Sequence, residues 1–121
     1  MNLSQPYIDP TAIENLRTIS PDDGGEFLRE LIDIFLADTP KRIAEIEQAL
    51  AAGNTEKLTR AAHSIKGSSG NFGAMQLTTL ARDLEEQGKA GDIAAVRVSL
   101  PALQAEFARV QPVLEQLKLG T

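Results

Sequence analysis

Apolar residues recur over positions 93–117 at intervals that alternate between three and four residues. Such an a/d heptad pattern predicts a long helix with a single apolar stripe that must be buried against other helices. We interpret the stripe as a seam inside one helical bundle rather than as a dimeric coiled coil, and we expect a monomer. Pro101 and Pro112 predict local kinks or a restart after Ser99. The stripe consists of Ile93, Val96, Leu100, Leu103, Phe107, Val110, Leu114 and Leu117.

A short helix is predicted near the N-terminus. Asp9 followed by Pro10 is typical of an N-cap and a first helical position. Ile8 and Ile13 have the spacing of a hydrophobic staple across this helix start. We expect the helix to end near residues 19–21, where a serine and a proline follow an isoleucine.

A second helix is expected to begin at Asp22 or Asp23 and to present a broad apolar face. Thr39 and Pro40 predict an interruption, with Thr39 as a new N-cap and Pro40 as the first residue of a continuing segment, at the cost of a backbone hydrogen bond and a kink. The apolar residues of the two segments are Phe27, Leu28, Leu31, Ile32, Ile34, Phe35, Ile43, Ile46 and Leu50.

Three further helices are predicted over the rest of the chain. Asn54 is the expected N-cap of one that ends in the glycine-rich stretch 70–73, and Asp92 is the expected cap of the last. Between them an amphipathic helix is expected to stop between Gly88 and Gly91; its apolar residues are Leu77, Leu80, Ala81 and Leu84. No segment shows convincing period-2 alternation. Short connections between amphipathic helices predict an all-α fold, an antiparallel four-helix bundle with an additional short N-terminal helix, in a single domain over residues 1–121.

Composition excludes several classes of function. The chain has 121 residues, one histidine and no cysteine, so disulfides, thiol catalysis and zinc–thiolate sites are excluded and no metal site is expected. A net charge of −5 argues against nucleic acid as a partner. No apolar run approaches the ~18 residues needed to span a bilayer, and the first residues do not resemble a signal peptide. We therefore expect a cytoplasmic protein with no membrane contact.

The single histidine lies on the polar face of its predicted helix. Leu58, Ala61, Ala62 and Ile65 form the apolar face, and His63 falls roughly 150° from its centre at about 100° per residue. His63 is therefore expected to point into solvent rather than into the core. Arg60, Gly67 and Gly70 fall near it on the helical wheel, with Lys66 on the flank.

Gly67 follows His63 by one turn on the same face. A glycine inside a helix costs roughly 0.5–1 kcal/mol relative to alanine, so its presence asks for a reason. Either the missing side chain lets a partner or a phosphoryl group approach the imidazole, or Gly67 begins the helix C-terminus. The spacing alone favours neither interpretation.

The chemistry available to this chain is limited. The glycine-rich stretch 67–73 follows a helix rather than a strand and lacks the ending of a phosphate-binding P-loop, so no ATP site is expected. Nothing resembles a nucleophile elbow with an oxyanion hole. A histidine that acts alone as a nucleophile remains, since a neutral imidazole has a free lone pair and can accept a phosphoryl group. Lys66 could neutralise the charge of that group, or could be an ordinary solvated lysine.

The run His63-Ser-Ile-Lys66-Gly67-Ser-Ser-Gly70-Asn-Phe-Gly73 resembles the signature of histidine-containing phosphotransfer (HPt) domains. The resemblance extends over roughly residues 8–118. It implies a phosphorelay intermediate, a phosphocarrier rather than an enzyme, that accepts a phosphoryl group on His63 from a receiver-domain aspartate and passes it to another receiver. The expected partners are receiver domains of response regulators or hybrid histidine kinases. They would supply Mg²⁺, and this chain would hold no cofactor.

The same resemblance assigns roles to individual residues. It implies that Lys66 stabilises the phosphate and that Gly67 and Gly70 keep the approach open. Some relatives orient the imidazole with a glutamine, and Glu85 stands at the matching position of this chain. Glu85 could accept a hydrogen bond from Nδ1 and leave Nε2 nucleophilic, or could simply be solvated. The candidates for receiver docking are Thr59, Arg60 and Ser64, of which Thr59 and Arg60 are expected to be exposed, as is Gly70.

Two other functions stay open. The chain could be the phospho-accepting module of a chemotaxis-type histidine kinase, which uses a similar His-Ser-Ile-Lys-Gly stretch. It could also be a helical adaptor that is never phosphorylated. Replacement of His63 separates the adaptor from the other two, and the source of the phosphoryl group separates those two from each other.

Overall fold

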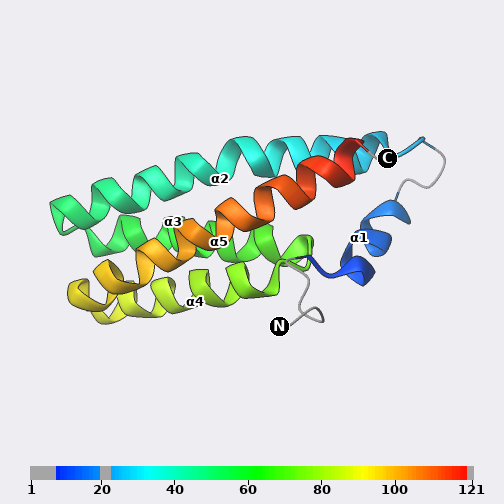
Figure 1. Cartoon of the computed structure of the whole chain (residues 1–121). Coiled ribbons are helices and arrows are strands. Elements are labelled where there is room, and N and C mark those ends of the chain that lie inside the picture. Colours follow the sequence, from blue (N-terminus) through cyan, green and yellow to red (C-terminus); the bar gives the residue numbers. More distant parts are fainter. Residues whose placement is uncertain (1–7, 20–22, 120–121) are drawn as a thin grey trace.

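The computed structural model describes residues 8–19 and 23–119. It contains α1 (Pro10–Arg17), α2 (Glu26–Ala52), α3 (Thr55–Asn71), α4 (Met75–Ala90) and α5 (Ile93–Leu119), and no strand among these residues. Helices α2 to α5 run up and down as a bundle, and the short α1 lies at one end of it, past the turn between α3 and α4 and beside the ends of α2 and α5 (Figure 1). The predicted all-α bundle with an extra N-terminal helix is confirmed. In the described part of the chain, no helix is both long and apolar enough to cross a membrane.

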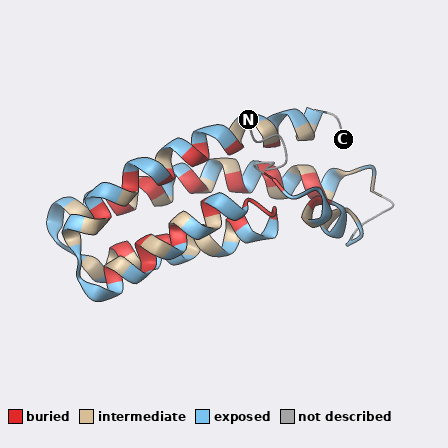
Figure 2. Cartoon of the chain, turned by 60° about the horizontal axis from the view of Figure 1, so that its bottom comes forward, coloured by how far each residue is buried: buried red, intermediate tan, exposed pale blue. Residues whose placement is uncertain are grey.

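The heptad of the last helix forms the seam of the bundle, as predicted. Its central residues from Val96 to Leu114 are buried, whereas Ile93 and Leu117 at its ends are only partly buried. Buried residues follow the inner faces of all four long helices (Figure 2). The centroid of the Phe35 ring lies 5.1 Å from that of Phe72 and 5.9 Å from that of Phe107. Aromatic contacts therefore join α2 both to the end of α3 and to α5.

The predicted interruption at Pro40 is wrong, because α2 runs from Glu26 to Ala52 as one helix with Pro40 inside it. A proline in a helix interior costs about 3 kcal/mol. Residues on both sides of Pro40, among them Phe35 and Ile43, are buried, and each such side chain contributes about 1.5–3 kcal/mol. Packing of the two halves against the same core therefore outweighs the lost hydrogen bond.

The role expected for Thr39 is also wrong. Its side chain is buried inside α2, and its hydroxyl has no hydrogen-bond partner, so it does not cap a helix. Of the two alternatives for the last helix, local kinks or a restart after Ser99, the restart is absent, since α5 continues through Pro101 and Pro112. Both prolines are exposed, which lets their rings face solvent while the opposite side of α5 packs.

The predicted caps hold at most helix starts. The Asp9 carboxylate accepts from the Thr11 amide at 2.9 Å, Asn54 caps α3 by accepting from Lys57, and Asp92 accepts from Ala95 at the start of α5. Ile8 and Ile13, the expected staple residues, are both buried.

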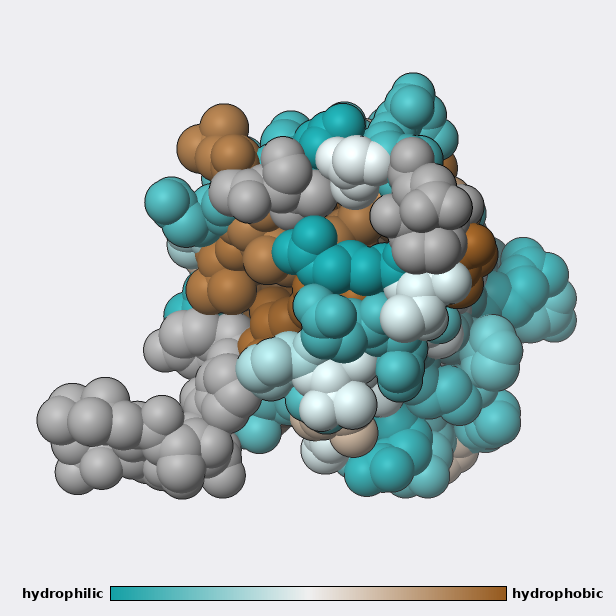
Figure 3. Space-filling view, turned by 90° about the vertical axis from the view of Figure 1, so that its right-hand side faces the viewer, coloured by the Kyte–Doolittle hydropathy of each residue, from teal (hydrophilic) through white to brown (hydrophobic). Residues whose placement is uncertain are grey.

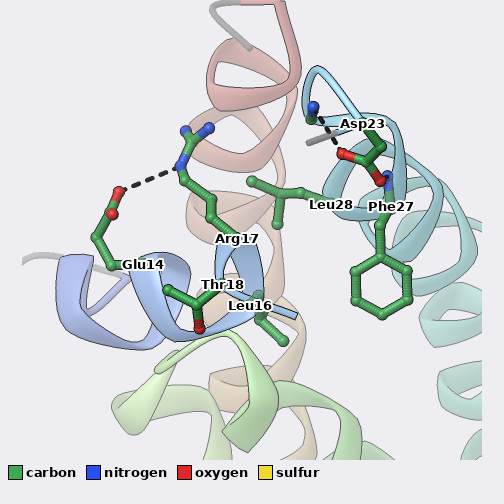
Figure 4. Close-up of a pocket in the computed structure, with 8 residues that line it drawn as sticks. Glu14, Leu16, Arg17, Thr18, Asp23, Phe27 and Leu28 are labelled. Atoms are coloured by element: carbon green, nitrogen blue, oxygen red, sulfur yellow. Dashed lines mark hydrogen bonds and ion pairs between the residues drawn. The ribbon is translucent and has the colours of Figure 1, made fainter. Parts of the chain in front are cut away.

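The start of α2 differs from the prediction. The N-cap position belongs to Gly25, which adopts a left-handed conformation, while the Asp23 carboxylate accepts from the amides of Gly25 and Phe27 at 3.0 Å (Figure 4). Asp23 therefore satisfies amides at the helix start from two residues before the cap. The alternative start at Asp22 and the end expected for the first helix beyond Ile19 fall in 20–22, outside the described residues; α1 itself ends at Arg17.

Helix α1 is fixed to the bundle through the turn between α3 and α4. The Asp9 amide donates to the Gly73 carbonyl at 3.0 Å, and a Cβ at Gly73 would lie 2.4 Å from the Cβ of Asp9. Gly73 also has a φ of 66°, so both its backbone and its contact with α1 require glycine. The apolar residues between α1 and the end of α5, including Pro10 and Val113, form a groove at this end, where hydrophobic side chains gather (Figure 3).

Helices α3 and α4 approach most closely at Gly88. A Cβ placed there would lie 2.4 Å from Thr59 Oγ1 and 3.0 Å from a methyl group of Leu58, whereas a Cβ at Gly67 would meet nothing within 4 Å. The two helical glycines therefore serve opposite purposes. Gly88 permits contact between two helices of this chain, and Gly67 leaves space on its surface.

We expect Gly88→Val to lower the free energy of unfolding by about 1–3 kcal/mol, because its side chain must push α3 away from α4. Gly67→Val is the matched control, since it adds the same side chain to a helix interior in open space, and we expect a change within about 0.5 kcal/mol. Urea unfolding followed by circular dichroism measures both variants. Equal destabilisation of the two would contradict the close approach at Gly88.

Candidate functional site

His63 projects from the exposed face of α3. Its side chain is 66% exposed, while the residues of the opposite face, Leu58, Ala61, Ala62 and Ile65, are buried in the core. The helical-wheel prediction of a solvent-facing imidazole is confirmed. Among the described residues no hydrogen-bond partner lies at Nε2, so this nitrogen faces outward with its electron pair available.

The other ring nitrogen is held by Glu85 from the neighbouring helix α4. Glu85 Oε2 lies 2.7 Å from His63 Nδ1, and the Glu85 side chain is only 7% exposed. The alternative of a solvated Glu85 is therefore wrong. An ionised carboxylate can only accept hydrogen bonds, so Nδ1 carries the proton of the neutral ring and Nε2 carries the lone pair.

Two lysines surround the same carboxylate. Lys66 Nζ lies 2.7 Å from Glu85 Oε1, and Lys89 Nζ lies 3.6 Å from Oε2. The hydrogen bond from Lys66 is the main cause that lowers the pKa of Glu85 to about 2; burial opposes this shift, and the hydrogen bond with His63 assists it. Glu85 thus stays ionised at every pH at which the protein is expected to function.

The approach to His63 is open on the side of Gly67 and Gly70. Both glycines are exposed, and a Cβ at either position would meet nothing within 4 Å. Helix α3 continues to Asn71, so Gly67 lies inside the helix rather than at its C-terminus. Of the two interpretations of Gly67, the structure agrees with the one in which a bare backbone leaves space beside the imidazole.

The three docking candidates lie in different environments. Arg60 is exposed and pairs with Glu56 at 3.3 Å. Thr59 is not exposed as expected: it is half-buried, its hydroxyl donates to the Thr55 carbonyl at 2.7 Å, and it lies against Gly88 between the two helices. Ser64 is half-buried, and its carbonyl accepts from the Ser68 hydroxyl at 3.0 Å. Of the three, only Arg60 is exposed.

Two contacts near the site were missed in the sequence. Lys89 stands four residues after Glu85, the spacing of an ion pair on one helix face, and that spacing was the available signal. The hydroxyls of Ser69 on α3 and Thr78 on α4 lie 2.8 Å apart, and nothing in the sequence indicated this pair. In residues 8–19 and 23–119 no group of three or more acidic or histidine side chains is placed to hold a metal ion.

The chain belongs to the Hpt domain family, whose model matches residues 30–112. Its fold is similar to the crystal structure of histidine-containing phosphotransfer protein B from Pseudomonas aeruginosa PAO1. That comparison has a TM-score of 0.88 and 30% identity over 98% of this chain and 99% of that one. A histidine-containing phosphotransfer protein from maize has the same fold, with a TM-score of 0.80 and 20% identity over 94% of this chain and 88% of that chain. Histidine-containing phosphotransfer protein 4 from Arabidopsis thaliana is 26% identical over 113 residues, which are 92% of this chain and 88% of that protein.

The lowered pKa of Glu85 predicts a specific loss of stability in acid. A carboxyl group whose folded-state pKa is about 2 stabilises the protein above its unfolded value near 4.5, and this contribution disappears as the pH falls from about 4.5 to about 2. We expect on the order of 2 kcal/mol from this group. Glu85→Gln should therefore be less stable than the native chain at pH 7, and the difference should vanish near pH 2.

Urea unfolding at several pH values measures this difference. Glu86→Gln is the matched control, because it removes a carboxylate from the next position of α4, where the side chain is exposed. A stability difference between the native chain and Glu85→Gln that did not change with pH would contradict the assignment of an ionised, buried Glu85.

Proposed function

We propose that the chain is a phosphorelay intermediate in which His63 Nε2 accepts a phosphoryl group from a receiver-domain aspartate and passes it to another receiver. This proposal rests on how the imidazole is held: Glu85 fixes Nδ1 at 2.7 Å, while the His63 side chain is 66% exposed. A ring held through one nitrogen and open at the other has both its tautomer and its direction set for nucleophilic attack.

The transfer step needs little more from this chain. The Nε2 electron pair attacks the phosphorus of the phosphoaspartate, and the bond from phosphorus to the aspartate oxygen breaks with its electrons left on the carboxylate. Lys66, whose side chain is 31% exposed, is close enough to the ring to turn toward the incoming phosphate and offset its charge. In this proposal Mg²⁺ and the acidic pocket come from the receiver, and the chain is a phosphocarrier without an ATP site.

We expect His63→Gln to abolish phosphorylation. The native chain, incubated with a phosphorylated receiver domain and Mg²⁺, should gain an acid-labile and alkali-stable phosphoryl label, because a phosphohistidine has this stability. The variant should gain none, since glutamine has no nucleophilic nitrogen. Glu86→Gln, exposed on α4, should be labelled like the native chain.

The same assay separates the remaining functions. Label from a histidine kinase with ATP, but from no receiver, would favour the phospho-accepting module of a kinase. No label from either source, together with partner binding that survives His63→Gln, would favour an adaptor and would overturn the proposal.

The role proposed for Gly67 predicts that a side chain at this position slows transfer from a receiver but not phosphorylation by a small donor. Gly67→Val adds a side chain beside the imidazole in space that this chain leaves empty. We expect transfer from a phosphorylated receiver to slow by at least about tenfold, since a misplacement of about 1 Å can cost that much or more. Labelling by phosphoramidate, a donor small enough to pass the new side chain, should change less than about twofold. Equal slowing with both donors would show that Gly67 acts on the ring rather than on access by a partner.

A further inference from the structure

The acceptor that holds the imidazole is a carboxylate, and this limits where the ring proton can go. Glu85 Oε2 lies 2.7 Å from Nδ1, and the pKa of Glu85 is lowered to about 2. The carboxylate has no proton to donate in the neutral pH range, so a hydrogen bond at this distance requires a proton on Nδ1. A glutamine here could rotate its amide and donate instead.

Phosphorylation at Nε2 changes the charge of the ring that Glu85 contacts. When the Nε2 electron pair forms the bond to phosphorus, the ring keeps its proton on Nδ1 and becomes a cation. The ring becomes neutral only if that proton then leaves to solvent. In that case a bare nitrogen lone pair would face a carboxylate oxygen across 2.7 Å with no hydrogen between them, which is electrostatically unfavourable.

The charges around the ring come from both helices that flank it. Glu85 and Lys89 project from α4, and Lys66 from α3. The two lysines disfavour a cationic ring, but Lys66 is itself paired with Glu85 at 2.7 Å. Two exposed arginines lie further along the same helices. Arg60 precedes His63 by one turn on α3 and has its own partner, Glu56, and Arg82 precedes Glu85 by one turn on α4. The group in direct contact with Nδ1 is the carboxylate, and since electrostatic energy falls with distance, its effect outweighs that of the cations.

We propose that Glu85 keeps the proton on Nδ1 of His63 after phosphorylation. Phospho-His63 then persists as a cationic ring and releases its phosphoryl group readily. This inference rests on the proposed function, because it requires a phosphoryl group at Nε2. A cationic ring leaves as neutral imidazole when the bond to phosphorus breaks, whereas a neutral ring must leave as an anion or first take up a proton. Phosphoryl transfer has a loose transition state with much bond breaking, so its rate depends strongly on the leaving group. Glu85 therefore acts as a positioning residue that favours onward transfer over storage.

The experiment measures hydrolysis of phospho-His63 as a function of pH. Native chain, Glu85→Gln and Glu86→Gln are phosphorylated with potassium phosphoramidate, freed of the donor and followed from pH 5 to pH 9. We expect equal rates for all three near pH 5, where every ring is protonated. At pH 8 we expect Glu85→Gln to lose its phosphoryl group about tenfold more slowly, which corresponds to a shift of one pH unit in the profile. Glu86→Gln should follow the native chain throughout.

Nuclear magnetic resonance gives a second readout that a purely structural role would not change. At pH 8 the phosphorylated native chain should show a proton bonded to ¹⁵Nδ1, and Glu85→Gln should not. Slower hydrolysis of Glu85→Gln by the same factor at every pH would overturn the proposal, because release of Lys66 toward the phosphate would explain it. Phosphoramidate loading needs no receiver. The inference about Glu85 can therefore fail while transfer from a receiver succeeds, and it can hold while transfer from a receiver fails. Absence of label at His63 from both donors would overturn the inference and the proposed function together.

Discussion

The close contact between α3 and α4 is the constraint on which the site depends. At Gly88 an added Cβ would clash with Thr59 of α3, and at the other end of the contact the part-buried Ser69–Thr78 pair joins the two helices at 2.8 Å. Glu85 lies one turn before Gly88 on α4, so this separation lets a side chain of its length reach His63 on α3. A wider separation would leave Glu85 in water, and the imidazole would then be free to choose either tautomer.

A buried carboxylate normally destabilises a protein unless donors surround it, and here the donors are also the groups to which we assign the phosphoryl chemistry. Glu85 is satisfied by His63 and Lys66, each at 2.7 Å, with Lys89 at 3.6 Å. Removal of one partner therefore affects the others, because the carboxylate that fixes the ring also holds Lys66, the lysine to which we assign the phosphate. Stability and the proposed chemistry therefore depend on the same contacts at Glu85, whereas a Cβ at Gly67 would meet nothing within 4 Å.

The sequence predicted what depends on periodicity and left open what depends on the distance between helices. The heptad from Ile93 to Leu117 predicted the buried seam, and the helical wheel predicted the exposed His63. The interruption predicted at Pro40 is wrong because the cost of a proline inside a helix is smaller than the packing energy of the buried residues on both sides of it. Whether Glu85 is solvated or bound to Nδ1 depends on how closely α3 and α4 pack, and the signal for that, Gly88 opposite Thr59, becomes readable only once the helices are paired.

The position of Lys89 bears on the proposed transfer step, in which Lys66 turns from Glu85 toward the phosphate. Lys66 is paired with Glu85 at 2.7 Å, so in the proposed transfer an arriving phosphate would compete with a buried carboxylate for it. Lys89 already lies 3.6 Å from the other oxygen of Glu85, and its side chain is 64% exposed, so in this proposal it would need to move by less than about 1 Å to reach the distance at which Lys66 is now held. The carboxylate then keeps a cation when Lys66 turns outward, and it avoids the large cost of an unpaired buried charge. In the proposed mechanism, two lysines around one carboxylate would therefore let Lys66 assist phosphoryl transfer while the imidazole stays in place.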